Sequence, residues 1–364
     1  MTSLLHRSAV ALAGGALIAT SIAGTAQAAP DDNGGSWLTR QLTNGLVHNG
    51  QYDFDDYGLT ADTAFALKYI GGQRDSVREI RNALSQHVDS WTTGVDFGSS
   101  DVYAGSTAKA VVLAESTGAD PRAFGGVDLV ARLNKRVSST APTVGRIQDK
   151  SASDYANVIG QALAARGLSV AESGKADEAV RFLLKQQCSA GYFRLNFARK
   201  TRLDQTCDGG RRATTSAPDT DVTAIAVLSL KAVPHKTPAI RSAIADAIAW
   251  LVRRQHDNGS FGGGPTTEAS NANSTGVAGW ALGELGACHA AQDAAQWVKN
   301  LQVTGDLSGT PLAGERGAIA YDRAALKAAK ANGIGDTERD QWRRATSQAA
   351  PALGNLRLAT CLQR

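Results

Sequence analysis

The sequence predicts an all-α fold: a closed ring of six helical hairpins, known as an α/α toroid, followed by one C-terminal helix. Three observations support this prediction. Six short alanine-rich apolar runs recur, amphipathic segments separate them, and strand patterns are nearly absent. The runs begin at Asp62, Ser106, Asn157, Asp221, Ser274 and Asp322.

The fourth run, DTDVTAIAVLSLKAV at residues 219–233, shows the pattern most clearly. It lies between Pro218 and Pro234, and it begins with acids that can cap the first turn of a helix. Its apolar residues cover nearly every direction around a helix, so the helix must be surrounded by protein. Because it is too short to span a bilayer, we expect it to be an inner helix of a soluble core.

The other runs follow the same plan. Each begins with Asp, Ser or Asn, which are residue types that cap helices, and five of the six end at a glycine. The amphipathic segments, expected to be outer helices, run from about 37 to 42, 75 to 91, 121 to 137, 173 to 187, 238 to 255 and 290 to 301. Six such pairs bury every inner face only when the chain closes into a ring.

The first 29 residues are expected to be a secretory signal peptide. His6 and Arg7 precede an apolar segment, and Ala26-Gln27-Ala28 matches a cleavage pattern of small residues. No later segment is long and apolar enough to be an anchor, so we expect a secreted, monomeric protein without a membrane anchor. The formal net charge of +4, with charges interspersed, argues against nucleic acid as a partner.

The chain is therefore divided into four parts. These are a signal peptide at 1–29, a disordered lead-in at 30–35, the toroid domain at 36–333, and a C-terminal helix with a disulfide-tied tail at 334–364. The final helix is expected at about 336–349.

Four cysteines follow the predicted signal peptide: Cys188, Cys207, Cys288 and Cys361. An even number outside the cell favours two disulfides, for which three pairings exist. Pairing Cys188 with Cys207 would clamp one long loop, and pairing Cys288 with Cys361 would tie down the tail. No Cys-x-x-Cys motif is present, which argues against a metal site.

Three loops between outer and inner helices carry a related motif. They contain Gln-x-x-x-Gly at 41–45, 187–191 and 255–259, and the last two continue to Phe193 and Phe261. This motif resembles the repeat of squalene/terpenoid cyclases and protein prenyltransferase β subunits. The inner-helix pattern is also similar to the helical domain of cobalamin carriers. The resemblance implies a toroid in which ligands lie over the N-termini of the inner helices.

Residues near those N-termini are the candidate ligand-binding residues. They are Tyr57, Asp62, Tyr103, Asp154, Tyr155, Asn157, Asp219, Asp221, Asn273, Trp280, Tyr321 and Asp322. Tyrosines can stack on a sugar or another polar ligand, while carboxylates and amides hydrogen-bond to it. The competing interpretation is that the short polar residues are helix caps and the tyrosines fill the ring. The loops at 45–57 and 188–216 are long enough to be lids, so the mouth could be open or plugged.

No recognised catalytic set emerges. Asp53-Phe54-Asp55-Asp56 has the letters of the acid motif of class II terpene cyclases, but the register of that family places its last acid at Asp62. Asp219 and Asp221 come closest to that motif in the fourth run. The zinc ligands of prenyltransferases are absent from the inner-helix starts, so neither a metal nor a cofactor is expected.

The leading hypothesis is thus a toroid that binds a small molecule or carbohydrate at its mouth without classical prenyltransferase or cyclase chemistry. One alternative is an extracellular (α/α)6 glycoside hydrolase or polysaccharide lyase that uses mouth carboxylates such as Asp154 or Asp322. A second is a class II terpene-cyclase-like enzyme, which protonates an alkene with a carboxylic acid. A third is cobalamin carriage, although the resembling carriers add a C-terminal β domain that this chain lacks after about residue 350.

Overall fold

The computed structural model describes residues 32–210 and 216–363. The predicted signal peptide and residues 30–31 of the predicted lead-in therefore lie outside the described residues. Residues 32–35 of that lead-in were expected to be disordered, but they form the first turn of helix α1 (Asp32–Thr39). Helices dominate the described chain and strands are few, which confirms the predicted helical class. No described helix is both long and apolar enough to cross a membrane.

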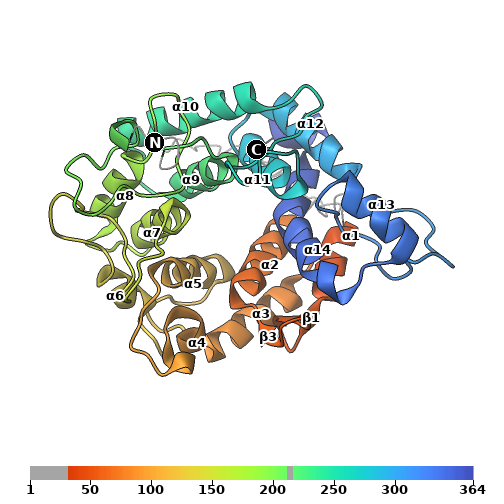
Figure 1. The fold of residues 1–364 in the computed structure, drawn as a ribbon, viewed down its shortest axis with the longest axis horizontal. Helices are drawn as coiled ribbons and strands as arrows, with labels where there is room; N and C mark the ends of the chain where they lie inside the picture. The colour runs from red at the N-terminus through yellow and green to blue at the C-terminus, as the bar shows by residue number, and fades with distance from the viewer. Residues whose placement is uncertain (1–31, 211–215, 364) are drawn as a thin grey trace, which may run out of the picture.

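Six helices form an inner ring, which Figure 1 shows along the shortest axis of the molecule. They are α2 (Tyr57–Ile70), α5 (Ala104–Thr117), α7 (Val158–Val170), α9 (Thr220–Ala232), α11 (Ala272–Glu284) and α14 (Asp336–Ala349). Each contacts the next in this order, and α14 contacts both α11 and α2. The ring is therefore closed.

Shorter or more amphipathic helices surround the ring (Figure 1). They are α1 (Asp32–Thr39), α3 (Arg74–Gln86), α4 (Val88–Thr92), α6 (Leu129–Asn134), α8 (Ala176–Leu184), α10 (Pro238–Arg254), α12 (Cys288–Lys299), α13 (Arg323–Asn332) and α15 (Leu358–Leu362). The 3₁₀ helices are η1 (Val95–Phe97), η2 (Asp208–Gly210) and η3 (Ala350–Asn355). Between neighbouring inner helices, α3 contacts α2 and α5, and α10 contacts α9 and α11.

A small antiparallel sheet lies between α1 and α2 and was not predicted. Its strands are β1 (Leu42–Thr43), β2 (Leu46–Asn49) and β3 (Phe54–Asp55), in that order. Leu42 pairs with Val47, and His48 pairs with Asp55. The strands are short enough that the apolar alternation typical of strands does not develop in the sequence.

One hydrogen bond recurs around the ring and fixes the register of the repeats. On five inner helices a side chain accepts the backbone N–H of a preceding loop, at 2.9 to 3.0 Å. On four of them this side chain lies near the start of the helix, and on α14 it lies near the C-terminal end. The acceptors are Thr60, Gln161, Thr223, Thr275 and Thr346. Each buries a loop N–H that would otherwise lack a partner.

The predicted loop motif has a clear physical role in this arrangement. Gln255 donates from Nε2 to the carbonyl of Gly259 at 2.9 Å and to that of Ala290 at 2.9 Å, which ties the loop to α12. Gly259 has a φ of 86°, and a Cβ there would lie 2.5 Å from the carbonyl oxygen of Asp293. Only glycine fits this position. Phe261, fully buried, then donates its N–H to Thr275.

This register corrects the predicted helix starts. Asn157 caps its helix as predicted, accepting the N–H of Gly160 at 3.1 Å. The caps of α2, α9 and α11 are instead Asp56, Asp219 and Asn271. Four of the residues predicted to lead the runs lie inside α2, α5, α9 and α11 instead: Asp62, Ser106, Asp221 and Ser274. Acids and amides recur near these helix starts, so residue type alone does not select the capping residue.

The sixth predicted inner helix is also wrong. Asp322 caps α13 as expected, accepting the N–H of Ala325, but Ala329 is the one buried residue in that helix. Figure 1 places α13 at the periphery. The position in the ring is taken by α14, the helix expected after the toroid. Its buried face consists of Trp342, Ala345, Thr346, Ser347 and Ala349.

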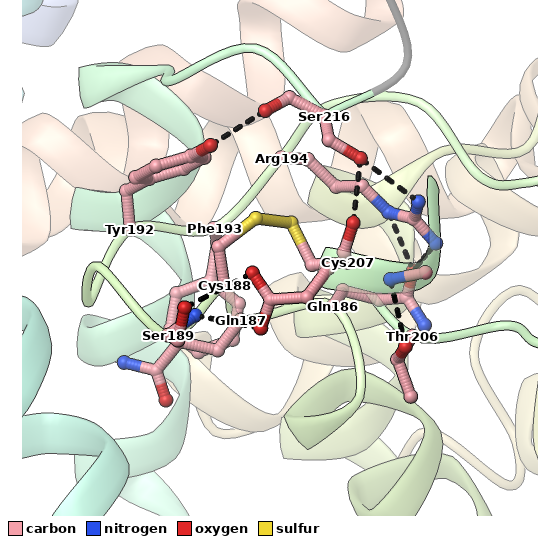
Figure 2. The surroundings of a disulfide bond; sticks show 12 residues. Gln186, Gln187, Cys188, Ser189, Tyr192, Phe193, Arg194, Thr206, Cys207 and Ser216 are labelled. Atoms are coloured by element: carbon pink, nitrogen blue, oxygen red, sulfur yellow. Dashed lines mark hydrogen bonds between the residues drawn. A yellow bond between two sulfur atoms is a disulfide. The ribbon is translucent and has the colours of Figure 1, made fainter. Parts of the chain in front are cut away.

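Both disulfides are present, and they link Cys188 to Cys207 and Cys288 to Cys361. The first holds the loop after α8 against Arg194, which is fully buried (Figure 2). Arg194 donates to Oε1 of Gln186 at 2.7 Å and to the carbonyl of Gln205 at 2.9 Å. Burial lowers the pKa of Arg194 to about 10. This charged centre replaces an apolar core in the loop.

Candidate functional site: a cavity along the ring axis

A cavity of about 600 Å³ lies inside the ring, within the size range of small-molecule sites. All six inner helices line it. Its apolar lining residues are Phe65, Ala66, Val112, Ile159, Leu163, Ile225, Leu228, Val277 and Trp280, and its polar ones are Asp62, Lys68, Tyr69, Lys109, Ser116, Arg166, Asp221, Ser229, Ser347 and Gln348. The inward faces of the inner helices thus combine apolar and polar side chains, and they do not fill the centre of the ring.

On most of the inner helices, lining residues recur at intervals of three or four. On α7 they are Ile159, Leu163 and Arg166, and on α9 Asp221 is followed by Ile225 and Leu228. This spacing keeps one stripe of each helix on the ring axis. The axis is lined from the N-terminal end of the helices to their C-terminal end.

At the N-terminal end, Asp221 carries a carboxyl group in an unusual environment. Its Oδ1 atom is excluded from solvent and makes no hydrogen bond to any described residue. Burial, and then the negative charge of Asp219, raise the pKa of Asp221 to about 6, while the Ser274 hydroxyl acts in the opposite direction. The pKa of Asp219 is also raised, chiefly by burial. Asp221 can therefore hold a proton near neutral pH.

A glycine-rich loop covers these two acids. A Cβ on Gly263 would lie 2.8 Å from Oδ2 of Asp221, and a Cβ on Gly264 would lie 2.3 Å from Oδ2 of Asp219. Glycine lets the backbone approach the carboxylates this closely. The loop therefore packs directly over the two carboxyl groups.

A second acid of the lining is already paired. Asp62 accepts from Nζ of Lys109 at 2.8 Å, and both side chains are partly buried. Since this ion pair neutralises its charge, Asp62 differs from Asp221, which faces no cation at salt-bridge distance in the described chain. The environment of Asp221 therefore favours protonation of its carboxyl group, whereas the ion pair of Asp62 favours the charged form.

The opposite end of the cavity carries aromatic rings and charged groups of both signs, since Glu284 and Glu115 lie there with Lys68 and Arg166. The rings of Tyr69 and Trp280 lie 4.9 Å apart between centroids, and Tyr69 donates to Glu284 at 2.9 Å. The indole N–H of Trp280 is buried and has no acceptor among the described residues. Lys68 is exposed at this end, where the cavity reaches the surface.

Arg166 also points its charge toward this end. Its Nε is buried without a hydrogen-bond partner in the described chain, and burial lowers its pKa. The neighbouring carboxyl group is that of Glu115, whose two oxygens likewise accept no hydrogen bond from described residues. Burial raises the pKa of Glu115 to about 8, against the opposing charge of Arg166.

Of the residues predicted to bind ligand, the structure brings Asp62, Asp221 and Trp280 to the cavity. Tyr321 lies close enough to Asp221 for the two to interact electrostatically, and its pKa is raised by burial and then by that carboxylate. Asn273 has a buried Oδ1 without a hydrogen-bond partner in the described part of the chain. The remaining predicted residues do not line the cavity: Tyr57, Tyr103, Asp154, Tyr155, Asn157, Asp219 and Asp322.

Several of those residues have structural roles instead. Asp154 accepts from Arg146 at 3.1 Å and from Lys200 at 2.9 Å. Burial would raise the pKa of Asp154, but its hydrogen bonds and these cations lower it overall. Tyr57 stacks on His87 at 5.4 Å between ring centroids, and Tyr155 is 79% exposed. Asn157, Asp219 and Asp322 are helix caps, as in the competing interpretation.

The acid cluster at 53–56 is structural as well. Asp56 caps α2 and forms an ion pair with Arg344 of α14, so it ties the start of the ring to its end. Asp55 accepts from His48 at 2.9 Å. Among the described residues, no group of three or more His, Cys, Asp or Glu side chains could hold a metal ion. Among the described residues of the loops at 45–57 and 188–216, considered as lids, none lines the cavity; residues 211–215 lie outside the described part of the chain.

Five residues that could take part in binding or catalysis were not predicted from the sequence. They are Tyr69, Lys109, Glu115, Arg166 and Gln348. Tyr69, Lys109, Glu115 and Arg166 each lie on an inner helix, at a distance of three, four or seven residues from a residue that lines the cavity. The helical period, counted from the recurring threonine, was the signal that could have found them.

A ring of helices around an axial cavity places this chain in the class of α/α-toroid proteins. Among solved structures, a type II terpene cyclase from Scytonema, with bound geranylgeranyl dihydroxybenzoate, superposes with a TM-score of 0.59 at 14% identity, covering 91% of this chain and 97% of that one. A protein from Actinoplanes superposes with a TM-score of 0.57 at 18% identity, covering 90% and 98%.

A glycosidase in complex with glucose also superposes, with a TM-score of 0.52 at 12% identity, covering 91% of this chain and 96% of that one. No family model matches the sequence, and no curated protein matches it. At these identities the similarities establish the fold class and leave function to the site itself.

Proposed function

We propose that this protein binds an apolar small molecule in the cavity along its ring axis. The observation that supports this proposal is the aliphatic wall of the cavity, with Trp280 and Phe65 beside it. The wall consists of Ile159, Leu163, Ile225, Leu228 and Val277. Such a wall favours a hydrocarbon or isoprenoid chain, since removing apolar surface from water is favourable. The ligand lies within the ring, whereas the sequence placed it over the mouth.

Export remains part of the proposal. The predicted signal peptide and the two disulfides support a protein that works outside the cell as a monomer. Its ligand would then be an extracellular apolar molecule.

The proposal is tested by filling the cavity. Leu163→Trp places an indole on the ring axis and is expected to weaken the binding of dodecanol at least tenfold by isothermal titration calorimetry, because the added ring occupies ligand space. Val252→Trp is the matched control, since Val252 lies on α10 and is 45% exposed. Undiminished binding in Leu163→Trp, or no binding to the unaltered protein, would contradict the proposal.

A second candidate function is acid catalysis on the bound molecule, favoured by the unpartnered carboxyl of Asp221. In this reaction the Asp221 O–H bond breaks, its proton forms a C–H bond with an alkene carbon, and the other alkene carbon becomes a cation. The cation then loses a proton to the Asp221 carboxylate. The aromatic faces of Trp280 and Tyr69 can stabilise positive charge at the far end. Acid catalysis of this kind is what a carboxyl with a raised pKa can perform.

Deuterium incorporation tests this candidate. Farnesol incubated with the protein in D2O should acquire deuterium on carbon, detected by mass spectrometry, and Asp221→Asn should abolish the uptake. Asp75→Asn, on an exposed outer-helix residue, should leave it unchanged. Equal deuterium uptake by Asp221→Asn and the unaltered protein would contradict the catalytic role and would leave the binding role intact.

The other sequence-based functions have less support from the cavity. A glycoside hydrolase needs two available carboxylates flanking the substrate. Asp62 is neutralised by Lys109, and Asp219 caps its own helix. Cobalamin is a far larger molecule than this cavity favours. Binding of glucose oligomers or of cobalamin inside the ring would reverse this ranking.

A further inference from the structure

We propose that the ligand is a single-chain amphiphile whose anionic head group is held by Arg166 and Trp280, at the C-terminal end of the cavity. This inference rests on the proposed binding function and names the class of molecule that the same cavity would take. It follows from the uneven distribution of charged and unpartnered groups along the ring axis.

The two ends of the cavity differ in charge. The acids of the lining, Asp221 and Asp62, lie toward the N-terminal end of the inner helices. Arg166 and Lys68 lie nearer to the C-terminal end. The aliphatic side chains of Leu163, Ile225 and Val277 lie about one helical turn from Arg166, toward the N-terminal end of the inner helices. An apolar tail that extends from a head group at Arg166 in that direction would contact them.

Two donors at the C-terminal end lack acceptors. The Trp280 N–H and the Arg166 Nε–H are both buried and make no hydrogen bond to the described chain. Trp280 and Arg166 occupy equivalent places, each five residues beyond the recurring acceptor side chain of its helix, Thr275 and Gln161. They therefore face the axis at the same level. A buried donor without an acceptor destabilises a fold, so the retention of both donors indicates a missing acceptor.

Glu115 does not supply that acceptor. No ion pair joins it to Arg166 within 4 Å in the described chain, and its carboxyl oxygens accept no hydrogen bond. Burial raises the pKa of this carboxyl and so favours its neutral form, which would leave the guanidinium charge without a counter-ion. Carboxylates and phosphates are the acceptors that a guanidinium binds best.

The position of the opening supports a head group here. Lys68 is exposed at this end, whereas the loop of Gly263 and Gly264 covers the acids at the other. An amphiphile entering beside Lys68 places its apolar tail toward Ile225 and leaves its head near the solvent. This orientation minimises the desolvation of the charged group.

The test compares ligands that differ only in the head group. Dodecanoate, dodecyl phosphate and dodecanol, each below its micelle concentration, are titrated into the protein at pH 7 and binding is measured by calorimetry. A charge-assisted hydrogen bond contributes about 1.5–3 kcal/mol, so at least one anion should bind about 10- to 100-fold more tightly than the alcohol. The stronger of the two anions identifies the head group.

Variants locate the effect. Arg166→Gln should reduce the preference for the anion to less than about threefold while dodecanol binding is retained. Arg166→Lys should retain part of the preference, and Arg78→Gln, on an exposed arginine of α3, should retain all of it. Circular dichroism verifies folding, and Arg166→Met, which also removes the charge, serves as the test variant if Arg166→Gln does not fold.

The outcomes separate the two proposals. Equal affinity of the unaltered protein for all three ligands overturns the head-group inference but leaves the apolar cavity function standing. A preference for anions that survives both substitutions of Arg166 also overturns it, since the anion then binds elsewhere. Failure of every ligand to bind contradicts the proposed function itself.

Discussion

Replacing Asp221 with asparagine is expected to stabilise the protein above pH 7. The folded chain raises the pKa of this carboxyl from its ordinary value of 3.8 to about 6. Between those values the folded state binds more protons than the unfolded state, so stability falls as pH rises from about 4 to 6. Above pH 6 the full cost of the buried charge is present. Asparagine removes it, and we expect a gain on the order of 2–3 kcal/mol at pH 8.

Urea unfolding at pH 8 and pH 4 measures this effect. At pH 4 the carboxyl is protonated in the folded state, so the difference between variant and unaltered protein should nearly vanish. Asp62→Asn is the matched control: it breaks the ion pair with Lys109 and should lower stability at pH 8. A loss of stability in Asp221→Asn at both pH values would show that the carboxyl has a structural role.

A gain of stability would also carry functional meaning. A residue that destabilises its own fold is commonly retained for binding or catalysis. Asp221 lines the cavity and lacks a hydrogen bond at Oδ1, which fits such a role.

The second large effect is expected for Gly276→Ala, at the contact between α11 and α14. A Cβ on Gly276 would lie 2.3 Å from Cα of Ala349 and 2.7 Å from the carbonyl oxygen of Gln348. These are backbone atoms, so α14 would have to move away from the ring. Overpacking usually costs about 1–3 kcal/mol, and we expect this substitution to lie at or above the upper value.

Gly105→Ala is the matched control for this prediction. Gly105 also lies in an inner helix, but a Cβ there would meet no atom within 4 Å. Alanine is expected to be neutral or to stabilise α5 by up to about 1 kcal/mol. Urea unfolding of both variants checks the contrast. Equal stability of the two would mean that α14 does not close the ring against α11.

The sequence predicted the helical class and five of the six inner helices, because their apolar residues cover all sides. It misplaced the sixth because α13 is alanine-rich, whereas most residues of α14 are polar or charged. In α14 only one face is buried, through Trp342, Ala345 and Ala349, and this single stripe is hidden among arginines and acids. Alanine fits an inner or an outer helix equally well, so composition cannot separate them.

The cavity could be predicted only in part. Asp221 and Trp280 were expected to bind ligand, but the aliphatic wall was not, because residues such as Ile225 and Leu228 resemble ordinary core residues. Whether such side chains meet or leave a space depends on the diameter of the ring, which is set by packing between distant segments. The unpaired state of Arg166 likewise depends on distances across the ring.

Diffraction from a crystal pressurised with xenon tests the central claim most directly, since xenon binds dry apolar cavities whatever the natural ligand is. The expected result is xenon density on the ring axis, in contact with Leu163, Ile225 and Leu228, with α14 lying between α2 and α11. An axis filled by side chains, or xenon found only outside the six helices, would contradict the account.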